Sequence, residues 1–227
     1  MKSFTGNFYR QHIPKLIQQK LDLYRGQSQV FWPHFIDTKT LFIHIPKAGG
    51  SSIGSALYGR NVGHRTAIEY SRISTTSFNK LFSFAFTRNP WDRCVSAYHF
   101  AKQDGTSVVS IPNKEKYLKS EFSSFESFVC NWLLKADLAN EDLIFQPQWW
   151  FVCDDKNRII INFVGKLENI YEDIKVIEKV LNKEIKIPKI NQSSRGSQSY
   201  RDYYTDETKA IVHSIYKKDI ELFGYEF

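Results

Sequence analysis

The feature that most constrains this chain is a pattern that occurs twice: a short apolar run, then a polar turn, then a helical pattern. The first run is Leu41–Ile45 and the second is Leu81–Thr87. Short apolar runs without alternation are typical of strands that are covered on both faces, as in parallel sheets. Helical patterns between such strands predict an α/β fold with a central parallel sheet, and the loops after the strands become the expected binding site.

The turn after the first run combines a lysine, two glycines and two serines. Its residues are Pro46, Lys47, Ala48, Gly49, Gly50, Ser51 and Ser52. Glycine lets the backbone approach an anion closely, and the N-terminus of a following helix offers N–H groups to a phosphate. A Walker A loop has its lysine after the glycines, whereas Lys47 precedes them. The segment predicts an anion site, and a glycine-rich turn with a solvent-exposed lysine is the structural alternative.

The turn after the second run carries an arginine and a helix start. Asn89 suits an N-cap and Pro90 the first helical position, which predicts a helix to about Lys102. Arg88 at the strand end and Ser96 on the helix are candidates to bind a second phosphate. A local ion pair with Asp92 is the alternative, and from the sequence we favour it for Arg93 but not for Arg88.

Composition restricts the class of protein. The chain has 227 residues and a net charge of +7, which suits one domain with an anionic partner. Three cysteines form no metal or disulfide pattern, and neither a signal peptide nor a transmembrane segment is evident, so the sequence favours the cytoplasm. We expect residues 1–35 to form an N-terminal helical extension, with a helix over 8–25, and residues 103–121 to form a substrate-side loop.

The rest of the chain yields further expected elements. A capping-box pattern at Ser123 opens a helix, and either a strand pair or an entry from a loop into a strand is expected over 151–153 and 159–164. Apolar spacing predicts a helix over 170–181 and a last helix after Thr205.

Together the two turns resemble the phosphate-binding motifs of sulfotransferases. The segment Ile45–Ser52 looks like their 5′-phosphosulfate-binding loop, and Arg88–Arg93 with Ser96 and Tyr98 looks like their 3′-phosphate-binding motif. The variant is most similar to the branch of carbohydrate sulfotransferases and their small bacterial relatives. The resemblance covers most of the chain beyond about residue 40.

The resemblance implies a P-loop-like three-layer α/β fold and the donor 3′-phosphoadenosine 5′-phosphosulfate, with no metal required. It assigns Lys47, Ala48 and the segment Gly49–Ser52 to the 5′-phosphosulfate, and Arg88 and Ser96 to the 3′-phosphate. In related folds a late loop adds a basic contact, for which Arg195 is the candidate.

The reaction implied is transfer of a sulfuryl group to an acceptor hydroxyl. Lys47 would stabilise the leaving phosphate, and His64, between the two motifs where a further strand is expected to end, is the first candidate for the base. Glu69 and Glu168 are alternative bases.

The acceptor is expected to be a saccharide by resemblance alone. The segment Gln148–Trp150 could line the acceptor or adenine pocket, and four lysines around the 103–121 loop could attract an acidic acceptor: Lys102, Lys114, Lys116 and Lys119. Competing functions are a phosphoryl-transfer enzyme such as a kinase, an inactive nucleotide-binding protein, and a nucleic-acid-binding module, for which no basic stripe is present.

Overall fold

Three parallel strands form the centre of the fold. The computed structural model describes residues 30–103, 105, 114–187 and 198–227. In this part of the chain the sheet has the order β1 (Thr40–Ile43), β2 (Phe82–Thr87) and β3 (Phe163–Lys166), and both pairings are parallel. The expected α/β class with a central parallel sheet is confirmed, and both apolar runs form strands.

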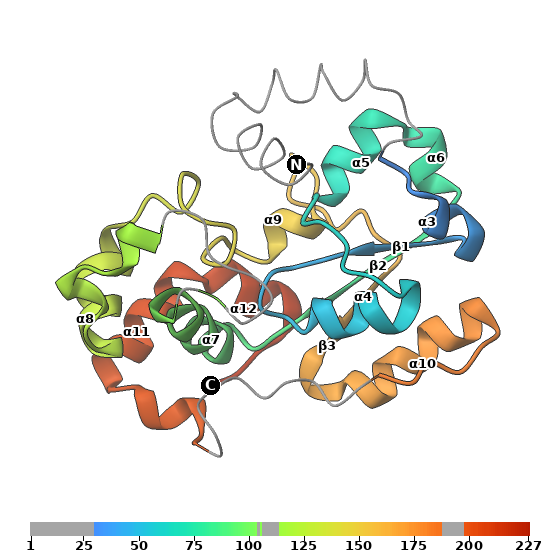
Figure 1. Cartoon of the computed structure of the whole chain (residues 1–227). Coiled ribbons are helices and arrows are strands. Elements are labelled where there is room, and N and C mark those ends of the chain that lie inside the picture. Colours follow the sequence, from blue (N-terminus) through green and yellow to red (C-terminus); the bar gives the residue numbers. More distant parts are fainter. Residues whose placement is uncertain (1–29, 104, 106–113, 188–197) are drawn as a thin grey trace.

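Helices make the connections between strands (Figure 1). A short helix, α3 (Pro33–Thr38), precedes β1. The chain passes from β1 to β2 through α4 (Gly50–Tyr58), α5 (Ala67–Ile73) and α6 (Thr75–Asn79).

The connection from β2 to β3 begins with the long helix α7 (Pro90–Lys102). It continues through α8 (Phe125–Ser127), a π-helical turn at Phe128–Trp132 and α9 (Trp149–Val152), with single 3-10 turns at Lys114–Tyr117, Ser120–Phe122 and Leu133–Lys135. After β3 come a 3-10 turn at Leu167–Asn169, α10 (Ile170–Leu181), a 3-10 turn at Tyr200–Tyr203, α11 (Asp206–Ile215) and α12 (Lys217–Phe223).

Several helix ends follow directly from the sequence. The Asn89 side chain accepts a hydrogen bond from the Trp91 amide, so α7 starts as the Asn-Pro pair predicts. Thr205 closes a capping box at the start of α11. The helix expected after Ser123 is capped by Ser124, and it continues from α8 without a break through the π-helical turn and a 3-10 turn to Lys135.

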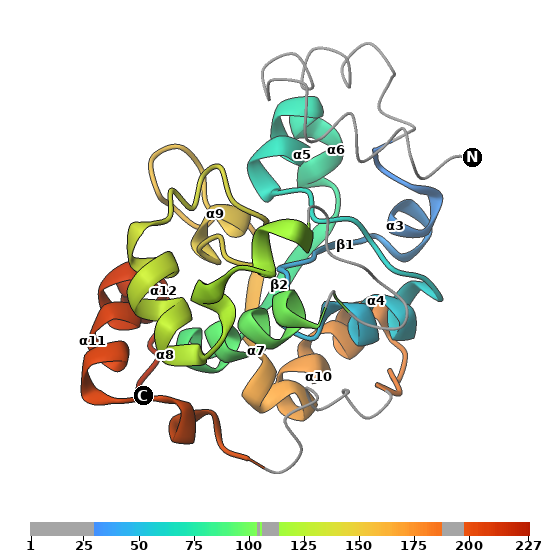
Figure 2. The ribbon, with the colours of Figure 1, turned by 60° about the vertical axis from the view of Figure 1, so that its left-hand side comes forward.

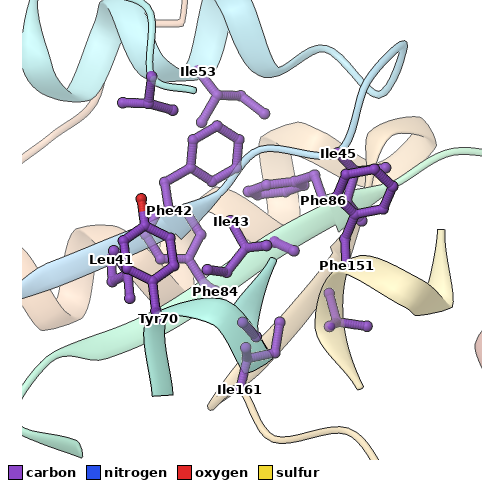
Figure 3. Packing of buried hydrophobic residues seen from close by; sticks show 14 of the residues in the cluster. Leu41, Phe42, Ile43, Ile45, Ile53, Tyr70, Phe84, Phe86, Phe151 and Ile161 are labelled. Carbon is purple, nitrogen blue, oxygen red and sulfur yellow. The ribbon is translucent and has the colours of Figure 1, made fainter. Parts of the chain in front are cut away.

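Two apolar clusters hold the fold together. The first covers the sheet and includes Phe42, Phe84 and Phe86, with Phe151 from α9 packed beside them (Figure 3). The second joins α7 to the helices α8, α11 and α12, which gather beyond the carboxyl ends of the strands (Figures 1 and 2). Because α7 starts where β2 ends, the two clusters meet along the β2–α7 connection.

Some expected elements differ from the structure. No strand forms over 59–66, so His64 lies on an irregular loop. Residues 151–153 belong mainly to α9, and the strand-pair alternative is reduced to a single bridge between Cys153 and Ile159. The segment 159–164 instead leads from a loop into β3 at Phe163, as the other alternative predicts. The four apolar residues of α9, Trp149–Val152, lie against α5.

The segments expected to lie outside the core are partly inside it. Val30, Phe31 and Phe35 are buried in the sheet cluster, although the rest of the predicted extension, including the helix over 8–25, lies outside the described residues. Tyr117, within the expected loop over 103–121, and Phe122, which directly follows that range, are buried in the second cluster. These aromatic side chains make the segment part of the fold.

Two more findings concern the described residues. All three cysteines are free thiols, and Cys94 and Cys153 are buried. Across the described ranges, the helices are too short or too polar to cross a lipid bilayer.

Gly165 in β3 gives a test of the sheet packing. A Cβ atom at this position would lie 2.6 Å from Cε1 of Phe86, so we expect Gly165→Ala to lower the free energy of unfolding by about 1–3 kcal/mol. Denaturant unfolding measures this change. Adding Phe86→Leu makes room and should make the two effects less than additive, whereas Gly59→Asn, at a left-handed position with no atom within 4 Å, should have little effect. Equal effects at Gly165 and Gly59 would contradict the packing.

Candidate functional site

The site begins where two neighbouring parallel strands end. Ile43, the last residue of β1, pairs with Ala85 of β2, so the turns after both strands leave the same edge of the sheet. The Arg88 guanidinium donates from Nη1 to the carbonyl oxygen of Lys47 over 3.2 Å. The sheet thus brings together the two motifs that are 41 residues apart in sequence.

The first turn has a backbone that is suited to hold an anion. Lys47 and Gly49 both have positive φ, 65° and 76°, and Lys47 does so without being glycine. Such conformations cost energy and cluster at ligand sites. The first helical bond of α4 runs from Ile53 N to Gly49 O, so the amides of Gly50–Ser52 precede the hydrogen-bond ladder of the helix.

Both glycines of this turn are required by close packing. A Cβ on Gly49 would lie 2.5 Å from the Leu167 side chain, and one on Gly50 would lie 1.8 Å from Cδ2 of His44. The glycine-rich turn predicted from the sequence is therefore fixed by its neighbours. Ser51 of the same segment is exposed, and Ser52 is half-buried.

Lys47 is a half-buried cation beside other cations. Its ammonium lies 3.9 Å from the centre of the Phe100 ring. Burial, followed by the charges of Arg88 and Arg93, lowers the pKa of Lys47 to about 8. The alternative of a solvent-exposed lysine is therefore wrong, and an anion next to this group would relieve the repulsion among the three cations.

Arg88 makes the ion pair that the sequence assigned to its neighbour. Its Nε donates to Asp92 over 2.8 Å, whereas Arg93 points elsewhere. The backbone of Arg88 is also held, because its N–H donates to Gln148 Oε1 and its carbonyl accepts from Gln148 Nε2. One buried amide side chain thus satisfies both backbone groups of the residue at the end of β2.

Arg93 is a buried link between the two motifs. Its side chain is 2% exposed, and Nε donates to the carbonyl oxygen of Pro46 over 2.9 Å. The buried carboxylate of Asp219, from α12, interacts with Arg93 and accepts hydrogen bonds from the amides of Gln148 and Trp149. Arg93 therefore supports the Lys47 turn, while Asp219 supports the residue that holds Arg88.

Sequence reasoning missed Gln148 as a support and Asp219 entirely. The structure places the Gln148 side chain on the Arg88 backbone, so this residue is no pocket-lining group. A signal for Asp219 was available: Val212, Tyr216, Asp219 and Phe223 follow helical spacing and are all buried. An acidic residue in a buried helical stripe indicates a buried polar contact.

His64 is held through one ring nitrogen. Its Nδ1 lies 2.9 Å from the carbonyl oxygen of His44, and because a carbonyl only accepts, Nδ1 carries the proton of the neutral ring. This arrangement leaves the lone pair on Nε2. The loop that carries His64 leads into α5, whose N-cap is Thr66.

The two carboxylates considered as alternative bases have structural contacts. Glu69 accepts from both the backbone and the hydroxyl of Thr66 and closes the capping box of α5. Glu168 accepts from the Asn89 amide over 2.6 Å and from the Tyr225 hydroxyl over 3.2 Å. Each of these carboxylates therefore holds a helix start in place.

The remaining predicted site residues are spread more widely. Ser96 lies on α7 and is 4% exposed, whereas Arg195 lies outside the described residues. Trp149 and Trp150 line a cavity of about 260 Å³ between α5 and α9, together with Ile68 and Cys153.

Two of the lysines near the 103–121 segment form hydrogen bonds or ion pairs with other parts of the protein. Lys102 donates to the hydroxyl of Tyr98 and to the carbonyl oxygen of Ser123, and Lys116 forms an ion pair with Glu141. In the described ranges, no three His, Cys, Asp or Glu side chains converge as metal ligands would.

This fold and this edge define a class: an α/β protein that brings a lysine turn and an arginine turn together at one edge of a parallel sheet. A model of the sulfotransferase family matches residues 35–226, so the chain belongs to the sulfotransferase family. An uncharacterized protein of Archaeoglobus fulgidus is 30% identical over 112 residues, which cover 48% of this chain and 76% of the archaeal one. No solved structure gives a significant match.

The buried link at Arg93 can be tested by comparing two arginines. We expect Arg93→Met to cost about 3–5 kcal/mol of unfolding free energy, because it removes the bond to Pro46 and leaves Asp219 without its cation. Arg72→Met removes an exposed ion pair with Asp155 and should cost less than about 1 kcal/mol. Similar unfolding free energies for the two variants would contradict a stabilising role of the buried Arg93 contacts.

Proposed function

We propose that this member of the sulfotransferase family transfers a sulfuryl group from 3′-phosphoadenosine 5′-phosphosulfate to a hydroxyl group of a saccharide. The observation that carries the proposal is the contact between Arg88 and Lys47, which unites two anion-binding turns at one sheet edge. A nucleotide with phosphates at both its 5′ and 3′ ends has two anionic groups for these two turns. A P-loop-like arrangement of the layers is part of the same proposal.

In this proposal the Lys47 turn binds the 5′-phosphosulfate. The amides of Gly50–Ser52 at the start of α4 face the anion, and the Lys47 ammonium lies next to the oxygen that bridges sulfur and phosphorus. Arg88 and Ser96 bind the 3′-phosphate, and Arg195 adds a further cationic contact. The family membership supports the donor, and the cluster of Lys47, Arg88 and Arg93 supports a polyanionic ligand.

The transfer step needs a base and a stabilised leaving group. The His64 Nε2 lone pair takes the proton of the acceptor hydroxyl as its oxygen attacks sulfur and forms the new S–O bond. The bond from sulfur to the bridging oxygen breaks, and its electron pair goes to the 5′-phosphate of the nucleotide product. The Lys47 ammonium stabilises that charge. The hydrogen bond of His64 Nδ1 to the His44 carbonyl supports this role, because it keeps the proton off Nε2.

The acceptor is proposed to be a saccharide that contacts the cavity between α5 and α9. The side chains of Ile68, Trp149 and Trp150 line it, and aromatic faces stack well on sugar rings. Asp154, Asp155 and Asn157 at the same cavity offer polar groups to hydroxyls. Ile68 at this cavity belongs to α5, the helix into which the His64 loop leads, and this supports the placement of the acceptor here.

Thermal stability tests the donor. We expect 3′-phosphoadenosine 5′-phosphate at about 100 times its Kd to stabilise the fold by about 2.7 kcal/mol, or roughly 5–10 °C in Tm. ATP and adenosine 5′-phosphosulfate lack the 3′-phosphate and should give much smaller shifts at the same concentration. Equal shifts for all three nucleotides, or no shift, would rule out the donor.

Three substitutions separate binding from chemistry. Lys47→Ala and Arg88→Ala should each weaken binding of 3′-phosphoadenosine 5′-phosphate by about 10–100-fold, because each removes a charge-assisted contact. His64→Ala should leave this Kd within about twofold and lower kcat by about 100-fold or more. Calorimetry and transfer of labelled sulfate measure the two quantities. Full turnover of His64→Ala would exclude His64 as the base.

The lowered pKa of Lys47 predicts how binding depends on pH. Lys47 is charged below about pH 8 in the free protein and loses its proton above that value. Because the anion requires the ammonium, the Kd of 3′-phosphoadenosine 5′-phosphate should be constant near neutral pH and rise toward about tenfold per pH unit above pH 8. Lys47→Arg stays charged, so its profile should be flat there. A wild-type profile as flat as that of Lys47→Arg would contradict this assignment.

A further inference from the structure

We infer that His44 is a positioning residue for the base: its side chain and its carbonyl together fix the His64 ring in the orientation that transfer requires. The inference rests on the proposed function, because it names the residue through which His64 is placed. From the sequence, His44 is only a packed residue at the end of an apolar run, and a positioning role there has no sequence signal.

Residue 44 makes two hydrogen bonds with the loop that carries His64, one through its side chain and one through its carbonyl oxygen. His44 Nδ1 lies 3.0 Å from the carbonyl oxygen of Val62, and His64 Nδ1 lies 2.9 Å from the carbonyl oxygen of His44. The ring centres are 4.1 Å apart. Residue 44 therefore contacts the loop at two points that are two residues apart, which fixes both the position of the loop and the rotation of the His64 ring.

The loop needs this support because no secondary structure provides it. The residues between α4 and α5 form neither helix nor strand. The His44 side chain comes from the buried end of β1 and is 6% exposed, so it is a rigid support for an irregular segment.

The hydrogen bond to Val62 and the burial of the ring restrict which side chains can replace His44. Burial, followed by the charge of His64, lowers the pKa of His44 to about 3, so the ring is neutral and has a single proton. The proton is on Nδ1, from which it is donated in a hydrogen bond to the Val62 carbonyl oxygen. A side chain here must donate from the Nδ1 position and must stay within the volume of an imidazole.

The same ring also contacts the donor side of the site. A Cβ atom on Gly50 would lie 2.1 Å from His44 Nε2, so the ring lies directly against the first residue of α4. One imidazole thus lies between the turn proposed for the 5′-phosphosulfate and the loop of the base. Its size sets how far the attacking oxygen and the sulfuryl group are held from each other, which is a quantity that transfer rates depend on steeply.

Two variants at position 44 test the inference. Asparagine places an amide N–H near the Nδ1 position and can still donate to Val62, whereas leucine has a similar volume and no donor. We expect His44→Leu to lower kcat by about 10–100-fold with the Kd of 3′-phosphoadenosine 5′-phosphate within about threefold of wild type, and His44→Asn to recover most of the loss.

A double variant separates positioning from a general loss of structure. If His44 acts through His64, then His44→Leu should lower kcat little further in a His64→Ala background. Independent, multiplicative losses, or wild-type kcat for His44→Leu, would overturn the inference. If His44→Leu does not fold, the His44→Asn variant tests the inference by itself. A kcat of His44→Asn as low as that of His64→Ala would also overturn the inference.

Nitrogen NMR of the histidines gives a readout that does not need turnover. We expect His64 to be mainly the Nδ1–H tautomer in the wild type and in His44→Asn, and to lose this preference in His44→Leu. An unchanged tautomer ratio in His44→Leu would overturn the inference. Absence of sulfuryl transfer by the wild type would instead defeat the proposed function, and the tautomer ratios would still test the contact between the two residues.

Discussion

The register of β1 and β2, from Thr40 opposite Phe82 to Ile43 opposite Ala85, makes the turns that follow them start side by side. Parallel strands require a crossover, here through α4, α5 and α6, so the two turns are far apart in sequence and adjacent in space. The contact of Arg88 with the Lys47 carbonyl depends on that register. A one-residue slip would turn the apolar side chains of β1 to the opposite face of the sheet and move the Lys47 turn away from Arg88.

Buried polar groups then fix the turns more finely than the strands can. Arg93 and Asp219 lie in the interior, where a single unpaired charge would be costly, but each has several partners. Arg93 donates to the carbonyl oxygen of Pro46 at the Lys47 turn. Asp219 accepts from the amide of Gln148, whose side chain in turn donates to the carbonyl oxygen of Arg88. Both turns are therefore supported by side chains that are buried in the interior. Such support keeps charged side chains in place even though they repel one another before an anion binds.

Much of this arrangement could be predicted from local patterns. The β1 and β2 strands, the Asn89 cap and α7 follow from apolar runs and helix-start chemistry, and the family resemblance rested on the same two turns. The ion pair of Asp92 was assigned to the wrong arginine, because Arg93 is held instead by the carbonyl oxygen of Pro46, a contact that sequence neighbours do not indicate. The roles of Gln148 and Asp219 also escaped prediction, since both act across more than 50 residues of sequence.

By itself the sequence determined the fold class, the order of the two turns that we propose as anion sites, and the glycines of the first turn. It did so because these features depend on neighbours within a few residues: apolar runs, N-caps and backbone freedom. Only the tertiary structure decided how the charged groups are used. It buried Arg93 rather than Arg88, gave Glu69 and Glu168 structural hydrogen bonds, and placed His44 against both Gly50 and the loop of His64. These outcomes depend on which surfaces meet when the strands and helices pack, and no local pattern in the chain records that.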